Sequence, residues 1–237
     1  MLPTSTFSLI YTAKIKPMRN KIIVLFLALL LSFSGYAQSK PSTWVELEFS
    51  KKIVKNLKVE FNPELRMLGG FEMDSYILEG GLSYKLHKYL TLAGYYRFEN
   101  EWKYKNSTGA YKGQVSSNRM AFDAKSGFEL KRFAIQLRVR YTNGSDFDQT
   151  TDDKASYFRY RAKLDYDVKG SKLVPFASVE AFHDLILKDV DKIRYTAGVA
   201  YSINKSNELG LFYRLQDYSE ADKESMNIIG IGYSLKF

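Results

Sequence analysis

Apolar and polar side chains alternate residue by residue along most of the chain after position 43. The clearest example, 133–141, places Phe133, Ile135 and Leu137 on one face and Gln136 and Arg138 on the other. A period of two residues predicts β-strands that separate an apolar from a polar environment. The same pattern predicts strands at 44–50, 56–67, 76–86, 90–98, 119–130, 133–141, 158–168, 174–182, 193–203, 209–215 and 226–237. Most of these segments approach the ~9–11 residues that a tilted membrane-spanning strand needs.

The final segment, 226–237, has an apolar face that ends in Tyr233, Leu235 and Phe237, whereas Gly230 and Gly232 lie on the opposite face. In a barrel wall, a terminal aromatic ring lies at the membrane interface, where such rings are favoured. An alternating last strand that ends on Phe is typical of the assembly signal of bacterial outer-membrane barrels. We therefore expect Tyr233, Leu235 and Phe237 to be recognised by the barrel-assembly machinery.

The amino-terminal region has the pattern of a secretory signal peptide. Arg19 and Lys21 precede an apolar run over 22–33, and small residues at 34–37 predict cleavage near Ala37. The run is too short for a transmembrane helix, which needs about 20 apolar residues. We expect residues 1–37 to be the leader, with a natural start at Met18 as an alternative, and 38–237 to form one barrel domain. The chain has no cysteine, so the exported domain has no disulfide framework.

The connections between the predicted strands alternate in length. Short connections fall at 87–88, 131–132, 169–172 and 204–206, and long ones at 99–117, 143–156, 184–192 and 217–225. Short turns on the periplasmic side and long loops outside are typical of outer-membrane barrels. The sequence therefore predicts an all-β fold, an antiparallel transmembrane β-barrel of the outer-membrane type with roughly 10–12 strands.

The expected number of strands depends on a general rule for bacterial barrels. Eleven segments alternate, whereas single-chain bacterial barrels have an even number of strands and both ends at the periplasmic rim. We expect twelve strands, with one strand hidden in the pattern, or ten if the segment at Trp44 is not a full wall strand. A soluble β-sandwich is the alternative, but the leader, the loop asymmetry and the last strand disfavour it.

Charge and composition limit the classes of binding partner that we expect. The formal net charge is +9, and it falls to +5 without the leader, which contains four bases and no acid. This excess is too weak and too scattered to indicate nucleic-acid binding. The aromatic content of 15%, with 18 Tyr and 16 Phe, fits a membrane barrel better. We therefore expect a bacterial outer-membrane location, with lipid and lipopolysaccharide as partners.

The polar faces of the strands carry charges of both signs. A charged Arg or Lys that faces lipid at the bilayer midplane costs ~2–4 kcal/mol, so these side chains should face the lumen. Arg138, Arg140, Arg159, Arg161 and Lys163 follow one another on consecutive strands and predict a basic wall. The expected counter-charges are Glu60, Glu64, Asp123 and Glu180.

Two functions are compatible with such a lumen. The favoured one is a structural or narrow-pore barrel whose interior is filled by paired charges. The alternative is a passive channel for small solutes, including anions, with the basic wall as its filter.

A third interpretation is an enzyme at the outer rim. The chain has two histidines, of which His87 falls in a predicted periplasmic turn. His183, next to Asp184, is therefore the candidate base for a lipid hydrolase, but the sequence places no serine beside it. We expect no enzyme, no metal site and no cofactor.

Short motifs across the mature region resemble the uncharacterised Bacteroidota outer-membrane family called domain of unknown function 2490. They are Trp44, Glu64-Leu65-Arg66, Leu82-Ser83-Tyr84, Gly94-Tyr95-Tyr96-Arg97-Phe98, Arg159-Tyr160-Arg161 and Pro175-Phe176-Ala177-Ser178-Val179-Glu180-Ala181-Phe182. The resemblance implies an outer-membrane barrel. It implies no activity and transfers no functional residues.

Overall fold

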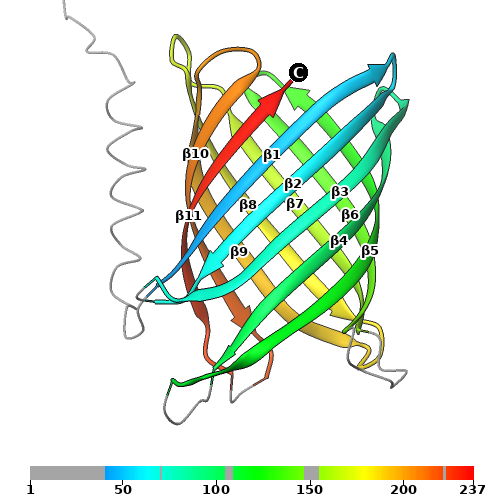
Figure 1. Ribbon diagram of the computed structural model, residues 1–237. Coiled ribbons are helices and arrows are strands. Elements are labelled where there is room, and N and C mark those ends of the chain that lie inside the picture. Colours follow the sequence, from blue (N-terminus) through cyan, green and yellow to red (C-terminus); the bar gives the residue numbers. More distant parts are fainter. Residues whose placement is uncertain (1–40, 70, 105–108, 147–154, 221–222) are drawn as a thin grey trace, which may run out of the picture. The chain divides into compact units, whose positions relative to one another are not determined.

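The computed structural model describes residues 41–237 except 70, 105–108, 147–154 and 221–222, so the predicted signal peptide lies outside the described residues. Within this range the chain forms eleven β-strands that close into one barrel (Figure 1). The strands are β1 (Ser42–Val54), β2 (Leu57–Met67), β3 (Met73–His87), β4 (Leu90–Tyr104), β5 (Tyr111–Leu130), β6 (Phe133–Asp146), β7 (Ala155–Tyr166), β8 (Leu173–Asp184), β9 (Asp189–Ser202), β10 (Asn207–Tyr218) and β11 (Met226–Lys236).

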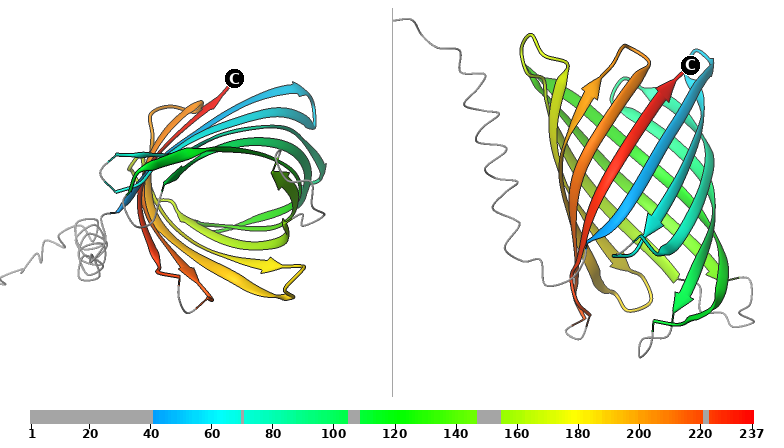
Figure 2. Two further views of the ribbon diagram at one scale, coloured as in Figure 1. Left: turned by 60° about the horizontal axis from the view of Figure 1, so that its bottom comes forward. Right: turned by 60° about the vertical axis from the view of Figure 1, so that its left-hand side comes forward.

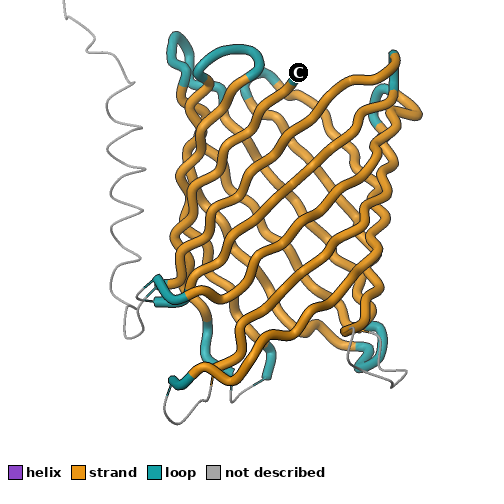
Figure 3. Tube along the Cα trace, viewed as in Figure 1, coloured by secondary structure: helices purple, strands orange, loops and turns teal. Residues whose placement is uncertain are grey.

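Strands and turns make up the whole described region, which contains no helix (Figure 3). Accordingly, the described residues include no helix with the length and hydropathy needed to cross a membrane.

Neighbouring strands along the chain pair antiparallel, but the barrel closes through a parallel pair between β1 and β11. In this pair Ser42 lies opposite Ile228 and Ser50 lies opposite Lys236. The predicted twelve strands were therefore wrong, as was a wholly antiparallel sheet. The segment at Trp44 is a full wall strand, and the eleven alternating segments account for all eleven strands. A parallel seam allows the ring to close with an odd number, so the even-number rule does not apply.

The two rims of the barrel differ in their connections. The short-turn rim carries the connections 55–56, 88–89, 131–132, 167–172 and 203–206, together with the carboxyl end of the chain (Figure 2). The opposite rim, which we call the long-loop rim, carries the connections 68–72, 105–110, 147–154, 185–188 and 219–225. The predicted long connection 184–192 was wrong, because β8 and β9 extend to Asp184 and from Asp189 and leave only the short turn 185–188. The predicted long connection 99–117 is mainly strand, because β4 and β5 extend as a hairpin to Tyr104 and from Tyr111.

An odd strand number also separates the two ends of the barrel sheet. β1 begins at the long-loop rim and β11 ends at the short-turn rim, since the two strands run in the same direction. The expectation that both ends lie at one rim was therefore wrong.

The outer face of the wall is apolar. Large apolar side chains remain exposed around the barrel, and they occupy alternate positions of the strands. Examples are Leu78, Leu82, Leu92, Tyr96, Met120, Phe122, Leu137, Val139, Tyr160, Leu164, Val179, Tyr195, Leu209, Leu211, Ile229 and Ile231. Monomeric soluble proteins rarely expose an apolar surface of this extent.

Small residues on the inner face provide space for inward-facing rings. A Cβ atom at Gly230 would overlap the ring of Phe212, which is buried on the neighbouring strand. The same atom at Gly81 would overlap the ring of Tyr95. These glycines let aromatic side chains lie flat against the wall, which leaves the centre of the barrel to charged groups.

Candidate functional site

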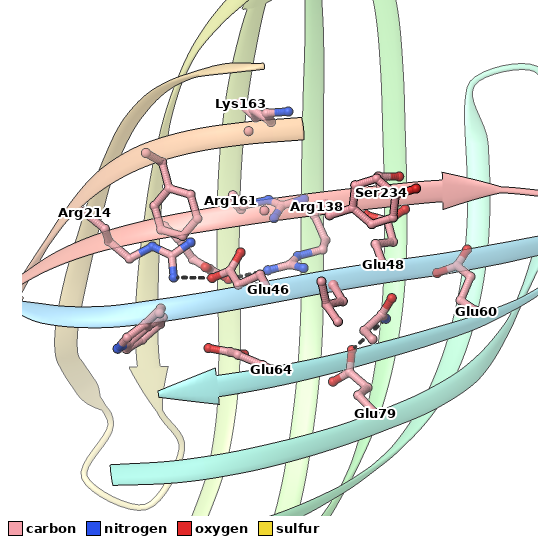
Figure 4. Close-up of a pocket in the computed structure, with 18 of the residues that line it drawn as sticks. Glu46, Glu48, Glu60, Glu64, Glu79, Arg138, Arg161, Lys163, Arg214 and Ser234 are labelled. Carbon is pink, nitrogen blue, oxygen red and sulfur yellow. Dashed lines mark hydrogen bonds and ion pairs between the residues drawn. The ribbon is translucent and has the colours of Figure 1, made fainter. Parts of the chain in front are cut away.

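A cavity of about 370 Å³ lies inside the barrel and is lined by charged side chains of both signs (Figure 4). Strands β1–β3 supply its acidic side, which consists of Glu46, Glu48, Glu60, Glu64 and Glu79. Strands β6, β7 and β9 supply its basic side, which consists of Arg138, Arg140, Arg159, Arg161, Lys163 and Arg194. In the strand order these two groups lie on opposite sides of the ring. The charges therefore create a field directed across the barrel axis.

Arg140 is the centre of a closed ion-pair network. Its Nε donates to Oδ1 of Asp123 at 2.5 Å and its Nη2 to Oδ2 at 2.9 Å, which is a bidentate pair. Its Nη1 lies 3.2 Å from Oε2 of Glu79, and Arg97 binds the same oxygen at 2.9 Å. The Arg140 and Asp123 side chains are 5% and 0% exposed. Lys125 lies 3.6 Å from Asp123 and 3.8 Å from Glu60, so three acids balance three bases and this network leaves no charge for a solute.

A second set of bonds connects the acidic side to β5. The Tyr95 hydroxyl donates to Oε2 of Glu60 at 2.5 Å, and the Ser83 hydroxyl donates to Oε1 at 2.5 Å. Lys125 donates to the Tyr95 hydroxyl oxygen at 2.6 Å and lies 3.8 Å from Glu60. Glu60 therefore has bound partners on three strands, and its role in this structure is to hold the wall together.

Trp44, at the start of β1, is buried beneath arginines from three other strands. The guanidinium carbons of Arg66, Arg214 and Arg194 lie 4.0, 5.0 and 5.3 Å from the ring centroid. Arg214 also pairs with Glu46 at 2.8 Å. Cation–π contacts of this kind hold guanidinium groups at fixed positions. They fill the lumen near the long-loop rim.

Trp44, Arg194 and Arg214 were absent from the predicted site residues. Their inward orientation follows from the alternation, but their convergence depends on the parallel seam between β1 and β11. The Trp at the start of the first strand was the feature of the sequence that could have indicated this cluster.

Arg138, Arg159, Arg161 and Arg194 form what we call the arginine cluster, and one carboxylate lies among them. Nη2 of Arg138 is 2.5 Å from Oε1 of Glu180, and Nη2 of Arg159 is 3.0 Å from the same oxygen. The Arg161 side chain forms no hydrogen bond or ion pair with any residue that the structure describes. The cluster thus has an excess of three positive charges over Glu180.

Aromatic and amide groups position the cluster. Nε of Arg194 donates to Oε1 of Gln216 at 2.5 Å, a neutral partner that leaves its charge uncompensated. The guanidinium carbons of Arg159 and Arg194 lie 4.4 and 4.7 Å from the ring centroid of Phe182. The Phe182 ring therefore makes cation–π contacts with both guanidinium groups and holds them in place.

The strand register places like charges directly opposite each other. Arg138 on β6 faces Arg161 on β7, and Arg140 faces Arg159 in the same strand pair. Like charges at directly opposite positions destabilise a sheet. A wall whose only task is stability would place acids at two of these four positions.

The other predicted lumen charges have local partners. Lys163 lies 2.7 Å from Asp165 on its own strand, and Glu64 lies 2.7 Å from Arg66. Of the predicted basic wall, Arg138, Arg159 and Arg161 thus come together in the arginine cluster, whereas Arg140 and Lys163 do not belong to it.

The residues of the predicted assembly signal lie in the closing seam. The Tyr233 hydroxyl donates to Oδ1 of Asn207 at 2.5 Å, and Leu235 pairs with Phe49 of β1. The backbone N–H of Phe237 donates to the carbonyl of Ser50 at 2.8 Å, and this residue is 71% exposed at the short-turn rim.

His183 and Asp184 do not form a catalytic pair. Asp184 is buried on the inner face together with Phe182, so the intervening His183 points to the outer face. The Asp184 carboxylate accepts hydrogen bonds from the backbone N–H groups of Ile186 and Leu187 at 2.7 and 3.0 Å. It caps the β8–β9 turn and does not orient the imidazole.

No group of His, Asp or Glu in the described part of the chain is arranged to hold a metal ion. The model of the family DUF2490, described as proteins of unknown function, matches residues 42–227. This match covers ten of the eleven strands and both sides of the cavity. No curated protein matches the chain.

Proposed function

This chain belongs to the DUF2490 family, and we propose that it is an outer-membrane barrel that forms a narrow pore with a preference for small anions. The observation that carries the proposal is the arginine cluster, in which four guanidinium groups surround the single carboxylate of Glu180. The proposal assigns no catalysis to the chain.

The exposed apolar face supports a membrane location. Burial of apolar surface is the main favourable contribution to folding, so a soluble barrel would place these side chains inside. This barrel instead exposes them and directs its arginines inward, which is the arrangement that lipid outside and water inside require. We further propose that the long-loop rim meets lipopolysaccharide and that β11 is read by the barrel-assembly machinery.

The uneven distribution of charge supports a pore over a purely structural interior. The network around Arg140 is neutral and explains stability without any solute. The arginine cluster is different, because its uncompensated charge lowers the energy of an anion inside the low-dielectric wall. A closed barrel filled by paired charges is the second candidate, and the closed networks around Arg140 and Glu60 favour it.

Single-channel recording in a planar bilayer tests the pore. The folded chain is inserted under a KCl gradient of about tenfold, and the reversal potential is measured. We expect steady conductance and a reversal potential displaced toward that of chloride. Arg161→Gln should move the reversal potential toward zero, because it removes an uncompensated charge from the cavity.

Lys55→Gln is the matched control, since Lys55 is an exposed turn residue and the same charge is lost outside the cavity. It should leave the selectivity unchanged. A silent bilayer from chain that migrates as a folded, heat-modifiable species would contradict the pore and support the closed barrel.

A further inference from the structure

We infer that the arginine cluster is a binding site for a small phosphate-class oxyanion with two negative charges. This inference rests on the proposed function and deepens it, because a general preference for anions does not require a site.

An orphaned donor points to a missing acceptor. Nε of Arg138 is buried and has no hydrogen-bond partner in the structure. A buried donor without a partner is destabilising, and such groups are rare in folded proteins. Its own Nη2 binds Glu180, so the guanidinium is held in place while one of its donors stays unused.

The strand register adds further donors at the same level of the wall. Arg161 faces Arg138 on one side and Glu180 on the other, and Arg194 faces Glu180 from β9. These residues form one continuous row across four strands. The row contains three guanidinium groups and one carboxylate, so an added anion would meet donors from β6, β7 and β9.

The number and direction of the donors favour a tetrahedral anion. A planar carboxylate is matched by one or two guanidinium forks, whereas a phosphate offers three acceptor oxygens in different directions. Arginine forks also bind phosphate more specifically than they bind a spherical halide. The cavity of about 370 Å³ is at the small end of ligand pockets, which limits the ligand to a small molecule.

Glu180 acts as the internal competitor of the bound anion. Its carboxylate occupies Nη2 of both Arg138 and Arg159, and its negative charge repels a second anion. The structure thus describes a site held in place by its own counter-ion, which a dianion approaches from the lumen.

Calorimetric titration of the folded chain in detergent micelles at pH 8 tests the site, with inorganic phosphate titrated against chloride at constant ionic strength. We expect saturable phosphate binding that chloride does not reproduce. Arg161→Gln should weaken it about tenfold or more, since a charge-assisted fork is lost. Glu180→Gln should strengthen it several-fold if the variant still shows heat-modifiable mobility.

Lys58→Gln is the control within the lumen, because Lys58 lies on the inner face of β2 but outside the cavity lining. It should bind phosphate as the original chain does. Glycerol phosphate, titrated in parallel, distinguishes the two sources of the ligand: tighter binding than phosphate indicates a phosphate ester, and weaker binding indicates the free ion.

Folded chain that binds no phosphate, or an Arg161→Gln variant that binds it unchanged, would overturn the site. These outcomes are separable from failure of the pore. Anion-selective conductance without phosphate binding rejects only the site. Phosphate binding with a silent bilayer rejects only the pore.

Discussion

Arg138 and Arg161 face each other directly across the β6–β7 ladder, and only Arg138 has a carboxylate partner. Opposed like charges weaken a sheet, so this pair opposes the stability of the wall. Such a feature is understandable where the charge binds a solute. Arg140 also faces an arginine, Arg159, but Arg140 is balanced by Asp123 and Glu79, whereas Arg161 has no carboxylate partner among the described residues. Function and stability are therefore expected to respond in opposite directions when Arg161 is changed.

Arg161→Gln should stabilise the barrel. The substitution removes one member of the like-charge pair, and we expect a gain of ~0.2–1 kcal/mol in the free energy of unfolding. Urea titration in phospholipid vesicles, read by heat-modifiable mobility, measures it. Lys55→Gln, which removes a charge from an exposed turn without an opposed residue in the β1–β2 ladder, should change little. A destabilised Arg161→Gln variant would mean that Arg161 contributes packing that outweighs its charge.

Arg140→Gln should have the opposite effect. Arg140 is buried and binds both oxygens of Asp123, so its loss leaves that buried carboxylate with only Lys125, whose Nζ lies 3.6 Å away. Breaking one side of a buried ion pair costs about 3–5 kcal/mol. The same urea titration should detect this loss.

The double variant Arg140→Gln/Asp123→Asn provides the check on this cause. It removes both charges, and it should recover a substantial part of the lost stability. No recovery would show that the shape of the Arg140 side chain matters more than its charge.

Gly230→Ala should destabilise the barrel by ~1–3 kcal/mol, because the added methyl group overlaps the buried ring of Phe212. Gly232→Ala is the matched control on the same strand and face, where the nearest atom to a new Cβ is 3.9 Å away. In a Phe212→Ala background the effect of Gly230→Ala should disappear. Equal effects of the two glycine substitutions would argue against this steric explanation.

Charged substitutions on the outer face test whether this face lies in a membrane. Leu82 and Leu86 are both exposed on β3, but Leu86 lies next to the turn and Leu82 lies nearer the middle of the strand. In lipid, Leu82→Arg should cost ~2–4 kcal/mol and Leu86→Arg ~0–1 kcal/mol. Urea titrations in vesicles should resolve this difference.

A water-soluble barrel makes a different prediction for the same two variants. Both leucines would then face solvent, and both substitutions would be close to neutral. Equal stabilities of Leu82→Arg and Leu86→Arg would therefore contradict the proposed membrane location.

The alternation of residues predicted the strands well, because each side chain must face either the apolar or the polar side of a wall. All eleven alternating segments became strands, although at one end or both the observed strand extends beyond the predicted one in every case except β2 and β11. The predicted strand number was nevertheless wrong. The alternation gives eleven segments, but the even number typical of bacterial barrels favoured twelve. Alternation gives the face of a residue but contains no information on how the first and last strands meet.

The ion-pair partners of the lumen charges could not be predicted from the sequence for a related reason. Asp123 and Arg140 are direct neighbours in the ladder, whereas Arg138 reaches over β7 to Glu180. Which of these pairs forms depends on register, and register depends on turns and on irregularities such as the shift near His87. The predicted basic wall therefore contained both a neutralised arginine and an uncompensated one, which the sequence did not distinguish.

The parallel seam between β1 and β11 has a consequence for the order in which the chain is assembled. Its paired residues, such as Ser42 and Ile228, belong to the first and last strands, which are the farthest apart along the sequence. Contacts between remote segments form slowly, because a long loop must close before they add stability. Until β11 arrives, β1 and β10 each present a row of unpaired backbone groups to their surroundings. The time spent in this open state, rather than the strength of any single contact, should decide whether a newly synthesised chain closes its barrel or aggregates.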